Sequence, residues 1–130
     1  MTSFLPSSAA MAFSKEPTTG EAISLERPRV ITLCGSTRFM NEFEKANTRL
    51  TLQGNVVFSV ATTAYEGSQN VSDEQKKLLD KVHFEKIRLS DEIFVINVGG
   101  YVGPSTKREI ELAKRTGKKI RFLESSTAVD

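Results

Sequence analysis

Tryptophan is absent from this 130-residue chain, and cysteine and histidine occur once each, as Cys34 and His83. One cysteine cannot form a disulfide within the chain, so the sequence is typical of a reducing compartment. A zinc site built from cysteine and histidine alone needs about four such ligands, so we expect neither a metal site nor a cofactor. Chemistry is expected instead from carboxylates, hydroxyls, lysine, arginine and the backbone.

Long apolar runs are also missing, since no stretch approaches the roughly 18 residues that cross a bilayer. Lysine and arginine number 18 against 16 acidic residues, which gives a net charge of +2. This balance requires neither a nucleic-acid polymer nor a membrane as partner. The basic run 114–121 spans an expected helix end, where cations complement the dipole, and no aromatic residue interrupts it. We therefore expect a cytoplasmic protein with a small-molecule partner.

The two ends of the chain differ in composition from its centre. Residues 1–28 hold three of the four prolines and show neither a helical nor a strand period, which predicts a disordered tail. A targeting peptide is the alternative, but no lysine or arginine precedes Lys15 and no long apolar segment follows. Residues 125–130 form a second predicted tail, and residues 29–124 form a single predicted domain.

Apolar runs alternate with helical patterns between these ends. The expected strands are Val30–Cys34, Val56–Val60, Ile93–Ile96 and Lys119–Leu123. The expected helices are 39–50, 73–89 behind a capping box at Ser72, and Thr106–Thr116. This order predicts an α/β fold of the flavodoxin-like kind. It is a three-layer sandwich with a four-stranded parallel sheet in the order 2-1-3-4 and helices on both faces.

Ligands of open α/β sheets bind beyond the carboxyl ends of the strands, which selects the segments 34–38, 61–69 and 97–109. In the first segment, Gly35 and Ser36 offer backbone N–H groups, and Arg38 offers a guanidinium for a phosphate. The alternative is that Ser36 only caps a helix and Arg38 is solvated. In the second segment, Tyr65 is placed to stack on a base or bond a hydroxyl, or it is only a partly buried cover.

Glu109 in the third segment has two interpretations. Thr106 and Glu109 have capping-box spacing, so Glu109 caps its own helix in the first interpretation, with Ser105 as another candidate cap. In the second, the first helical turn keeps the carboxylate ionised beside the cleft, ready to attack an electrophilic sugar carbon. Glu111 points to the opposite side of the helix and is the weaker candidate.

His83 and Cys34 also have two interpretations each. His83 shares a helix face with Leu79 and Ile87, which is typical of a core residue, although nearby Asp80 makes a proton-shuttling pair conceivable. Cys34 ends a buried strand and has no histidine near it in sequence, which favours a buried thiol over a reactive one.

Several segments together resemble the nucleoside 2-deoxyribosyltransferase-like superfamily, which includes 2′-deoxynucleoside 5′-monophosphate N-hydrolases. They are Ile31–Phe39, Ser90–Asn97, Ser105–Ala113 and Gly117–Lys119, within a resemblance that spans about Arg29 to Glu124. Compact phage and bacterial members look most similar. The resemblance implies a flavodoxin-like fold and cleavage of the N-glycosidic bond of a nucleoside or its 5′-monophosphate. The sugar then passes to water or to another base.

The resemblance also implies residue roles. Glu109 matches the family's nucleophile, which takes the sugar C1′ to form a glycosyl-Glu intermediate. The expected substrate contacts are Gly35, Ser36 and Arg38 after the first strand, Tyr65 after the second, and Asn97, Gly103, Ser105 and Thr106 after the third. The family's proton donor to the leaving base is an Asp on the preceding helix, and His83 stands at that position with Asp80 one turn earlier. Which of the two donates is open.

Two departures from the family pattern bear on the site. Ser105 stands where the family usually has Gly, which changes the anion-binding turn. The chain ends after the fourth expected strand, whereas members often continue into a fifth strand and a helix that complete a neighbour's site. A homodimer or higher oligomer is expected by analogy alone.

Two alternative functions stay open. The cytokinin-activating phosphoribohydrolases have a G-G-x-G-T-x-x-E loop, which Gly99, Gly100, Thr106 and Glu109 match loosely. The other alternative is a non-catalytic nucleotide-binding or sensing module, in which Glu109 only caps its helix.

Overall fold

The computed structural model describes residues 27–61 and 71–125. Its elements in chain order are β2 (Val30–Gly35), η2 (Thr37–Phe39), α1 (Met40–Leu52), β3 (Val56–Phe58), α3 (Asp73–Leu89), β4 (Glu92–Ile96), η4 (Val98–Gly100), α4 (Pro104–Arg115) and β5 (Lys119–Phe122). None of the helices in these ranges has both the length and the apolar character needed to cross a membrane.

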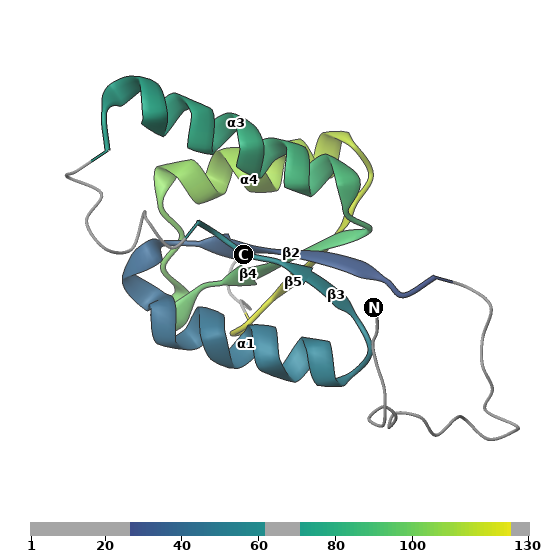
Figure 1. The fold of residues 1–130 in the computed structure, drawn as a ribbon. Coiled ribbons are helices and arrows are strands. Elements are labelled where there is room, and N and C mark those ends of the chain that lie inside the picture. The colour runs from purple at the N-terminus through teal and green to yellow at the C-terminus, as the bar shows by residue number, and fades with distance from the viewer. Residues whose placement is uncertain (1–26, 62–70, 126–130) are drawn as a thin grey trace, which may run out of the picture.

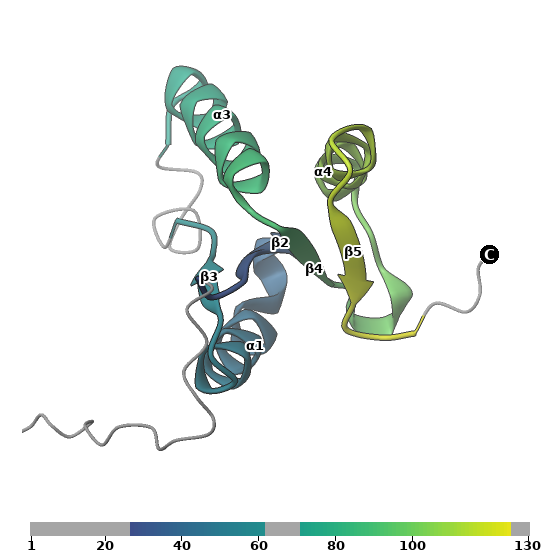
Figure 2. The same cartoon turned by 90° about the vertical axis from the view of Figure 1, so that its right-hand side faces the viewer.

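The four strands form one parallel sheet in the order β3-β2-β4-β5. Helix α1 covers one face of the sheet, and α3 and α4 lie together over the other (Figures 1 and 2). This arrangement is the predicted 2-1-3-4 sheet in a three-layer sandwich, so the predicted α/β fold class is confirmed. The first strand β2 and the third strand β4 are central neighbours, with Cys34 opposite Val95 and Gly35 opposite Ile96.

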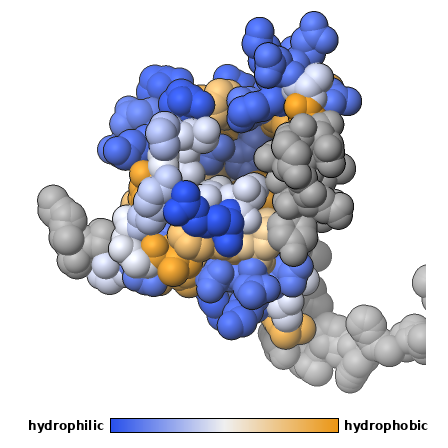
Figure 3. Space-filling view, turned by 90° about the vertical axis from the view of Figure 1, so that its left-hand side faces the viewer, coloured by the Kyte–Doolittle hydropathy of each residue, from blue (hydrophilic) through white to orange (hydrophobic). Residues whose placement is uncertain are grey.

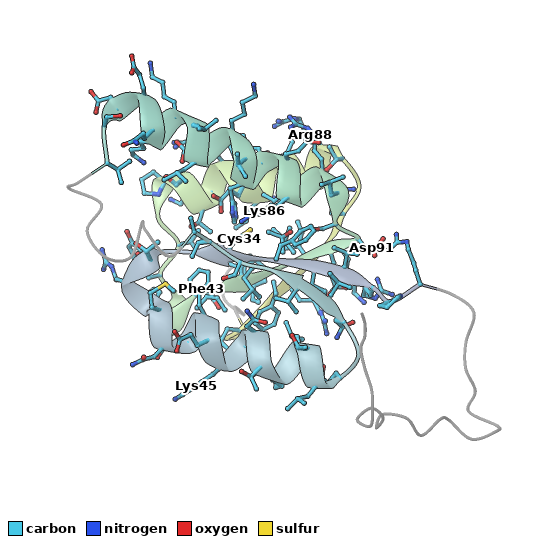
Figure 4. All side chains as sticks on the ribbon, viewed as in Figure 1. Cys34, Phe43, Lys45, Lys86, Arg88 and Asp91 are labelled. Atoms are coloured by element: carbon cyan, nitrogen blue, oxygen red, sulfur yellow. The ribbon has the colours of Figure 1, made fainter. Side chains whose placement is uncertain are left out.

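The side-chain alternation of β2 divides the core into two halves. Ile31 and Leu33 pack with Phe43 of α1 on one face of the sheet. Cys34 packs with Ile87 of α3 on the other face. In Figure 4, Cys34 lies between the sheet and α3, whereas Phe43 lies between the sheet and α1. Because side chains alternate along a strand, the last residues of β2 place Cys34 on the same side of the sheet as α3 and α4.

Helix α3 begins with the predicted capping box. The Gln75 backbone N–H donates to Ser72 Oγ over 3.0 Å, and the Ser72 backbone N–H donates to Gln75 Oε1, also over 3.0 Å. This reciprocal pair satisfies two of the donors that every helix start leaves free.

Helix α4 begins two residues earlier than predicted. Gly103 is its N-cap and Pro104 its first residue, and no side chain caps this end. Proline suits the first helical position because its missing N–H is not needed there. The predicted capping box of Thr106 and Glu109 is therefore wrong, as is the alternative cap at Ser105. Thr106 lies inside the first turn, and Glu109 lies in the second.

Two further boundaries differ from the predictions. The strand expected to reach Val60 ends at Phe58. Arg27, which the sequence placed in the tail, donates to Asp91 over 2.8 Å, so contact with the domain starts before residue 29. Residues 1–26 and 126–130 of the two predicted tails lie outside the described residues.

Candidate active site

One cleft of about 420 Å³ opens where β2 ends and α4 begins, with α3 along its side. Figure 3 views the molecule from this end, where hydrophilic side chains lie around and among paler and hydrophobic ones. Eight of the residues predicted from sequence line the cleft: Gly35, Ser36, Asp80, His83, Gly103, Ser105, Thr106 and Glu109. They come from three segments that are far apart in the chain, and the parallel sheet brings them to one edge.

Gly35 forms the floor of the cleft at the point where β2 ends. Its φ is +150°, and a Cβ at this position would lie 2.9 Å from the carbonyl oxygen of Ile96 on β4. Only glycine allows the two strands to approach so closely in this conformation. The predicted glycine turn is therefore required for the shape of the site.

Glu109 enters the cleft from the inward face of α4. It lies three residues after buried Thr106 and three before buried Leu112, so the 3.6-residue period turns it toward the sheet. Its Oε1 atom is fully buried and has no hydrogen-bond partner among the described residues. A buried carboxylate oxygen without a partner is costly, and such groups are found mostly where function requires them.

Burial raises the pKa of Glu109 to about 7, and the nearby charge of Asp80 adds to the effect. The Cys34 thiol, which lies near Glu109 without a hydrogen bond of normal geometry to Oε1, and the Arg108 charge act in the opposite direction, but burial outweighs them. The sequence predicted that the helix dipole would hold Glu109 ionised, and this prediction is wrong. The carboxyl sits one turn further into the helix than expected, where loss of water dominates.

His83 lies beside Glu109 on the inward face of α3. Its Nε2 atom is 3.8 Å from Glu109 Oε1 and 3.6 Å from Cys34 Sγ. Burial lowers the pKa of His83 to about 4, and the charge of Lys86 contributes to this. The imidazole is therefore neutral at neutral pH, which counts against His83 as the acid that protonates a leaving base.

Cys34 is fully buried beneath the cleft, as the sequence indicated. Burial raises the pKa of its thiol well above the usual value, and the charge of Glu109 adds to the shift. The group is therefore a neutral thiol and not a poised nucleophile.

The start of α4 offers backbone donors at the edge of the cleft. Pro104 has no N–H, and no side chain caps this end, so the first-turn N–H groups of Ser105 and Thr106 have no capping partner. The Ser105 hydroxyl accepts a hydrogen bond from Arg108 Nη2 over 3.3 Å. A helix start of this kind favours phosphate or sugar oxygens.

Arg38 does not line the cleft, although the sequence predicts that its guanidinium binds a phosphate there. The Arg38 backbone N–H donates to Ser36 Oγ over 3.3 Å, so Ser36 caps the short η2 turn. The guanidinium carbon lies 4.6 Å from the centre of the Tyr101 ring. Tyr101 lines the cleft, whereas Arg38 does not. The structure thus places Arg38 behind an aromatic residue of the wall.

Two lysines of α3 line the cleft and were missed by the sequence argument. They are Lys76, which is exposed, and Lys86, whose Nζ donates to the carbonyl oxygen of Ser59 over 2.6 Å. Lys76, Asp80 and His83 are spaced by four and three residues, which puts them on one helix face. Because Asp80 and His83 were already candidates, this spacing could have identified Lys76 as a cleft residue from the sequence.

Besides Arg38, two other predicted substrate contacts are not among the cleft residues. Asn97 is 1% exposed, and its side chain donates to the Glu124 carbonyl and accepts from the Glu124 N–H over 3.1 and 2.8 Å. Both its polar atoms are therefore used to hold the residues that follow β5, and its role as a substrate contact stays a prediction. Tyr65 lies outside the described residues.

The described residues include one cluster of metal-ligand type, formed by Cys34, His83 and Glu109. A carboxylate is the third donor of this cluster, whereas the expectation of no metal site rests on the scarcity of cysteine and histidine alone.

No protein-family model and no curated protein matches this chain. A solved structure that does match is the Clostridium botulinum CMP N-glycosidase BcmB, with a TM-score of 0.51 and 23% sequence identity. The match covers 72% of this chain and 70% of that one. At this identity the likeness shows a shared fold, which agrees with the fold that the family resemblance implied.

Proposed function

We propose that this protein cleaves the N-glycosidic bond of a nucleoside 5′-monophosphate, with Glu109 as the nucleophile. The observation that carries the proposal is the position of the Glu109 carboxylate, which lines the cleft beside the uncapped start of α4. Its buried Oε1 atom has no hydrogen-bond partner among the described residues. A protein of the same fold that is named a CMP N-glycosidase supports the choice of bond and substrate.

The reaction follows from the chemistry of a positioned carboxylate. Glu109 attacks the sugar C1′, the C1′–N bond breaks, and the base leaves with a proton from the enzyme. Water or a second base then attacks C1′, the C1′–O bond to Glu109 breaks, and the proton lost by the attacking group returns to the enzyme. This is the two-step course of retaining glycoside chemistry, in which the first product leaves before the second step. Hydrolysis and base transfer share the glycosyl-Glu intermediate, so the same residues serve both.

Asp80 is the proposed proton donor to the leaving base. It lines the same cleft as Glu109, from α3, one helical turn before His83. His83 is neutral at neutral pH and contacts Glu109, which suits a residue that positions the nucleophile. A substrate with a nitrophenol leaving group, which departs without protonation, separates these roles. It should restore activity to Asp80→Asn but not to His83→Gln.

The start of α4 is the proposed site of the 5′-phosphate. The N–H groups of Ser105 and Thr106 supply donors, and Lys76 supplies a positive charge from the opposite wall. Phosphates bind well at such helix starts because the free N–H groups and the helix dipole act together. Gly35 and Ser36 form the floor on which the sugar would lie.

The test is a panel of ribo- and deoxyribonucleosides and their 5′-monophosphates, with and without an acceptor base, analysed by chromatography for released or exchanged base. We expect base release from monophosphates, and loss of that release in Glu109→Gln but not in Glu111→Gln. Glu111 is the matched control because it is an exposed carboxylate on the other side of α4. Failure of every substrate to lose its base would refute the proposal.

The same panel decides between the alternatives. Gly99 and Gly100, which suggested a phosphoribohydrolase, form the η4 turn and do not line the cleft, so the structure does not favour that reading. Strict preference for ribonucleoside monophosphates would support it. A non-catalytic module would be stabilised against heat by a nucleotide without releasing base. A homodimer and a cytoplasmic location stay predictions, and sedimentation velocity tests the first.

A further inference from the structure

Three atoms of metal-ligating type converge where the cleft meets the core. They are Cys34 Sγ from β2, His83 Nε2 from α3 and Glu109 Oε1 from α4, in a group whose ligand atoms all lie within 4.8 Å of one another. The sulfur is 3.6 Å from Nε2, and Nε2 is 3.8 Å from Oε1. Each residue comes from a different element, so the fold holds the three atoms in place.

The two printed separations are close to those around a tetrahedral zinc ion. Zinc lies about 2.3 Å from a thiolate sulfur and about 2.0–2.1 Å from nitrogen or oxygen ligands. A tetrahedral angle then places sulfur and nitrogen about 3.6 Å apart, and nitrogen and oxygen about 3.3 Å apart. The observed 3.6 and 3.8 Å need side-chain movements of a few tenths of an ångström. The third separation, from Cys34 Sγ to Glu109 Oε1, is at most 4.8 Å and has to reach about 3.6 Å, which rotation of the Glu109 carboxyl can supply.

The burial of the cluster provides a second, independent observation. Glu109 Oε1 is fully buried and lacks a hydrogen-bond partner among the described residues. Cys34 is 0% exposed and His83 is 8% exposed. An unpaired oxygen of this kind carries a desolvation cost that a bound cation would remove.

We propose that Cys34, His83 and Glu109 form a binding site for a thiophilic divalent cation of the zinc class. Thiolate and imidazole ligands favour zinc over magnesium or calcium, which prefer oxygen. Three protein ligands leave a fourth position, and Glu109 and His83 line the cleft, so water or substrate reaches that position. The thiol proton of Cys34 passes to solvent when the metal binds, because the ligand is the thiolate.

Occupation of this site switches the enzyme off, a consequence that rests on the proposed function. The carboxylate that would hold the metal is the carboxylate that would attack C1′, so cation and reaction compete for Glu109. Zinc is therefore expected to inhibit base release, and a chelator is expected to restore it. Binding of the cation itself does not depend on the function.

Cobalt(II) titration followed by absorbance tests the binding directly. A thiolate ligand gives a sulfur-to-cobalt charge-transfer band, and the chain has one cysteine and one histidine, so the band reports Cys34 alone. We expect one cobalt per chain, displaced by zinc. Zinc affinity should fall by more than about tenfold in Cys34→Ser and in His83→Gln, since even loss of a supporting residue costs 10–100-fold. Glu111→Gln should bind like the wild type.

Absence of the thiolate band from the wild-type protein would overturn the inference, as would unchanged zinc affinity in both ligand variants. Circular dichroism checks that each variant folds. If Cys34→Ser does not fold, the test relies on the zinc affinity of His83→Gln and on the cobalt band of the wild-type protein. The two proposals fail separately. Cobalt binding without base release from any nucleotide would refute the function and leave the cation site. Base release without a cobalt band would refute the cation site and leave the proposed function.

Discussion

The pH dependence of base release is the prediction that follows most directly from the geometry of the site. Burial raises the pKa of Glu109 from 4.5 to about 7, which corresponds to roughly 3 kcal/mol against ionisation. The nucleophile must be the carboxylate, so kcat/KM is limited by the fraction of free enzyme in which Glu109 is ionised. We expect kcat/KM to rise with pH through a midpoint near 7 and to fall about tenfold for each pH unit below about 6.5.

The raised pKa of Glu109 also predicts how the stability of the protein depends on pH. Because the folded pKa is raised, the native state holds the Glu109 proton more tightly than the unfolded chain between pH 4.5 and about 7. This contribution is present below pH 4.5 and is lost as the pH rises through about 7. The difference in unfolding free energy between wild type and Glu109→Gln should therefore change by roughly 3 kcal/mol over that range.

Urea unfolding of both proteins at pH 5 and pH 8 measures this difference, and the kinetic profile is recorded in the same buffers. Glu111→Gln serves as the control, because removal of an exposed carboxylate should leave the midpoint unchanged. A kinetic midpoint near 4.5, together with an unfolding difference that does not depend on pH, would refute the reasoning. Those two results would mean that the Glu109 carboxyl is solvated.

Three further predictions concern the sheet that carries the site. Gly35→Ala should lower stability by about 1–3 kcal/mol in thermal unfolding, because its Cβ would meet the Ile96 carbonyl and its φ is positive; a neutral effect would mean that β2 and β4 separate freely. Asn97→Ala should cost about 1–3 kcal/mol by freeing the residues that follow β5, yet leave KM unchanged; a large rise in KM would support its role as a substrate contact. Arg121→Met should cost about 1 kcal/mol, because Arg121 Nη2 lies 2.6 Å from the buried Glu92 but is itself 45% exposed, and Arg29 stays 3.5 Å from the same carboxylate; the double variant with Glu92→Met should recover most of that loss, and no recovery would contradict the account.

The layers of the fold could be predicted from sequence because each element carried its own local signal. The continuous apolar run at Val30 indicated a strand buried on both faces, and Ser72 with Gln75 indicated a helix start, and both signals reflect short-range physics. The start of α4 was misplaced because the capping-box spacing of Thr106 and Glu109 outweighed the signal of Pro104, although proline is favoured at the first helical position.

The site was less predictable than the fold because burial is a property of the assembled chain. The sequence brought Glu109, His83 and Asp80 to one edge of the sheet, but it gave no means of estimating how much water each would lose. The two pKa shifts that define the site have burial as their main cause. The closeness of Cys34 to His83 also depends on how α3 crosses the sheet, since the two residues are 49 positions apart.

The central claim is that Glu109 attacks the sugar, and its removal tests that claim most directly. The measurement is the rate of base release from a nucleoside 5′-monophosphate by Glu109→Ala, with and without azide, against Glu111→Ala as the control. The account predicts a loss of at least roughly a thousandfold, partial recovery with azide and a sugar azide as the product. Base release by Glu109→Ala within about tenfold of the wild-type rate would contradict it.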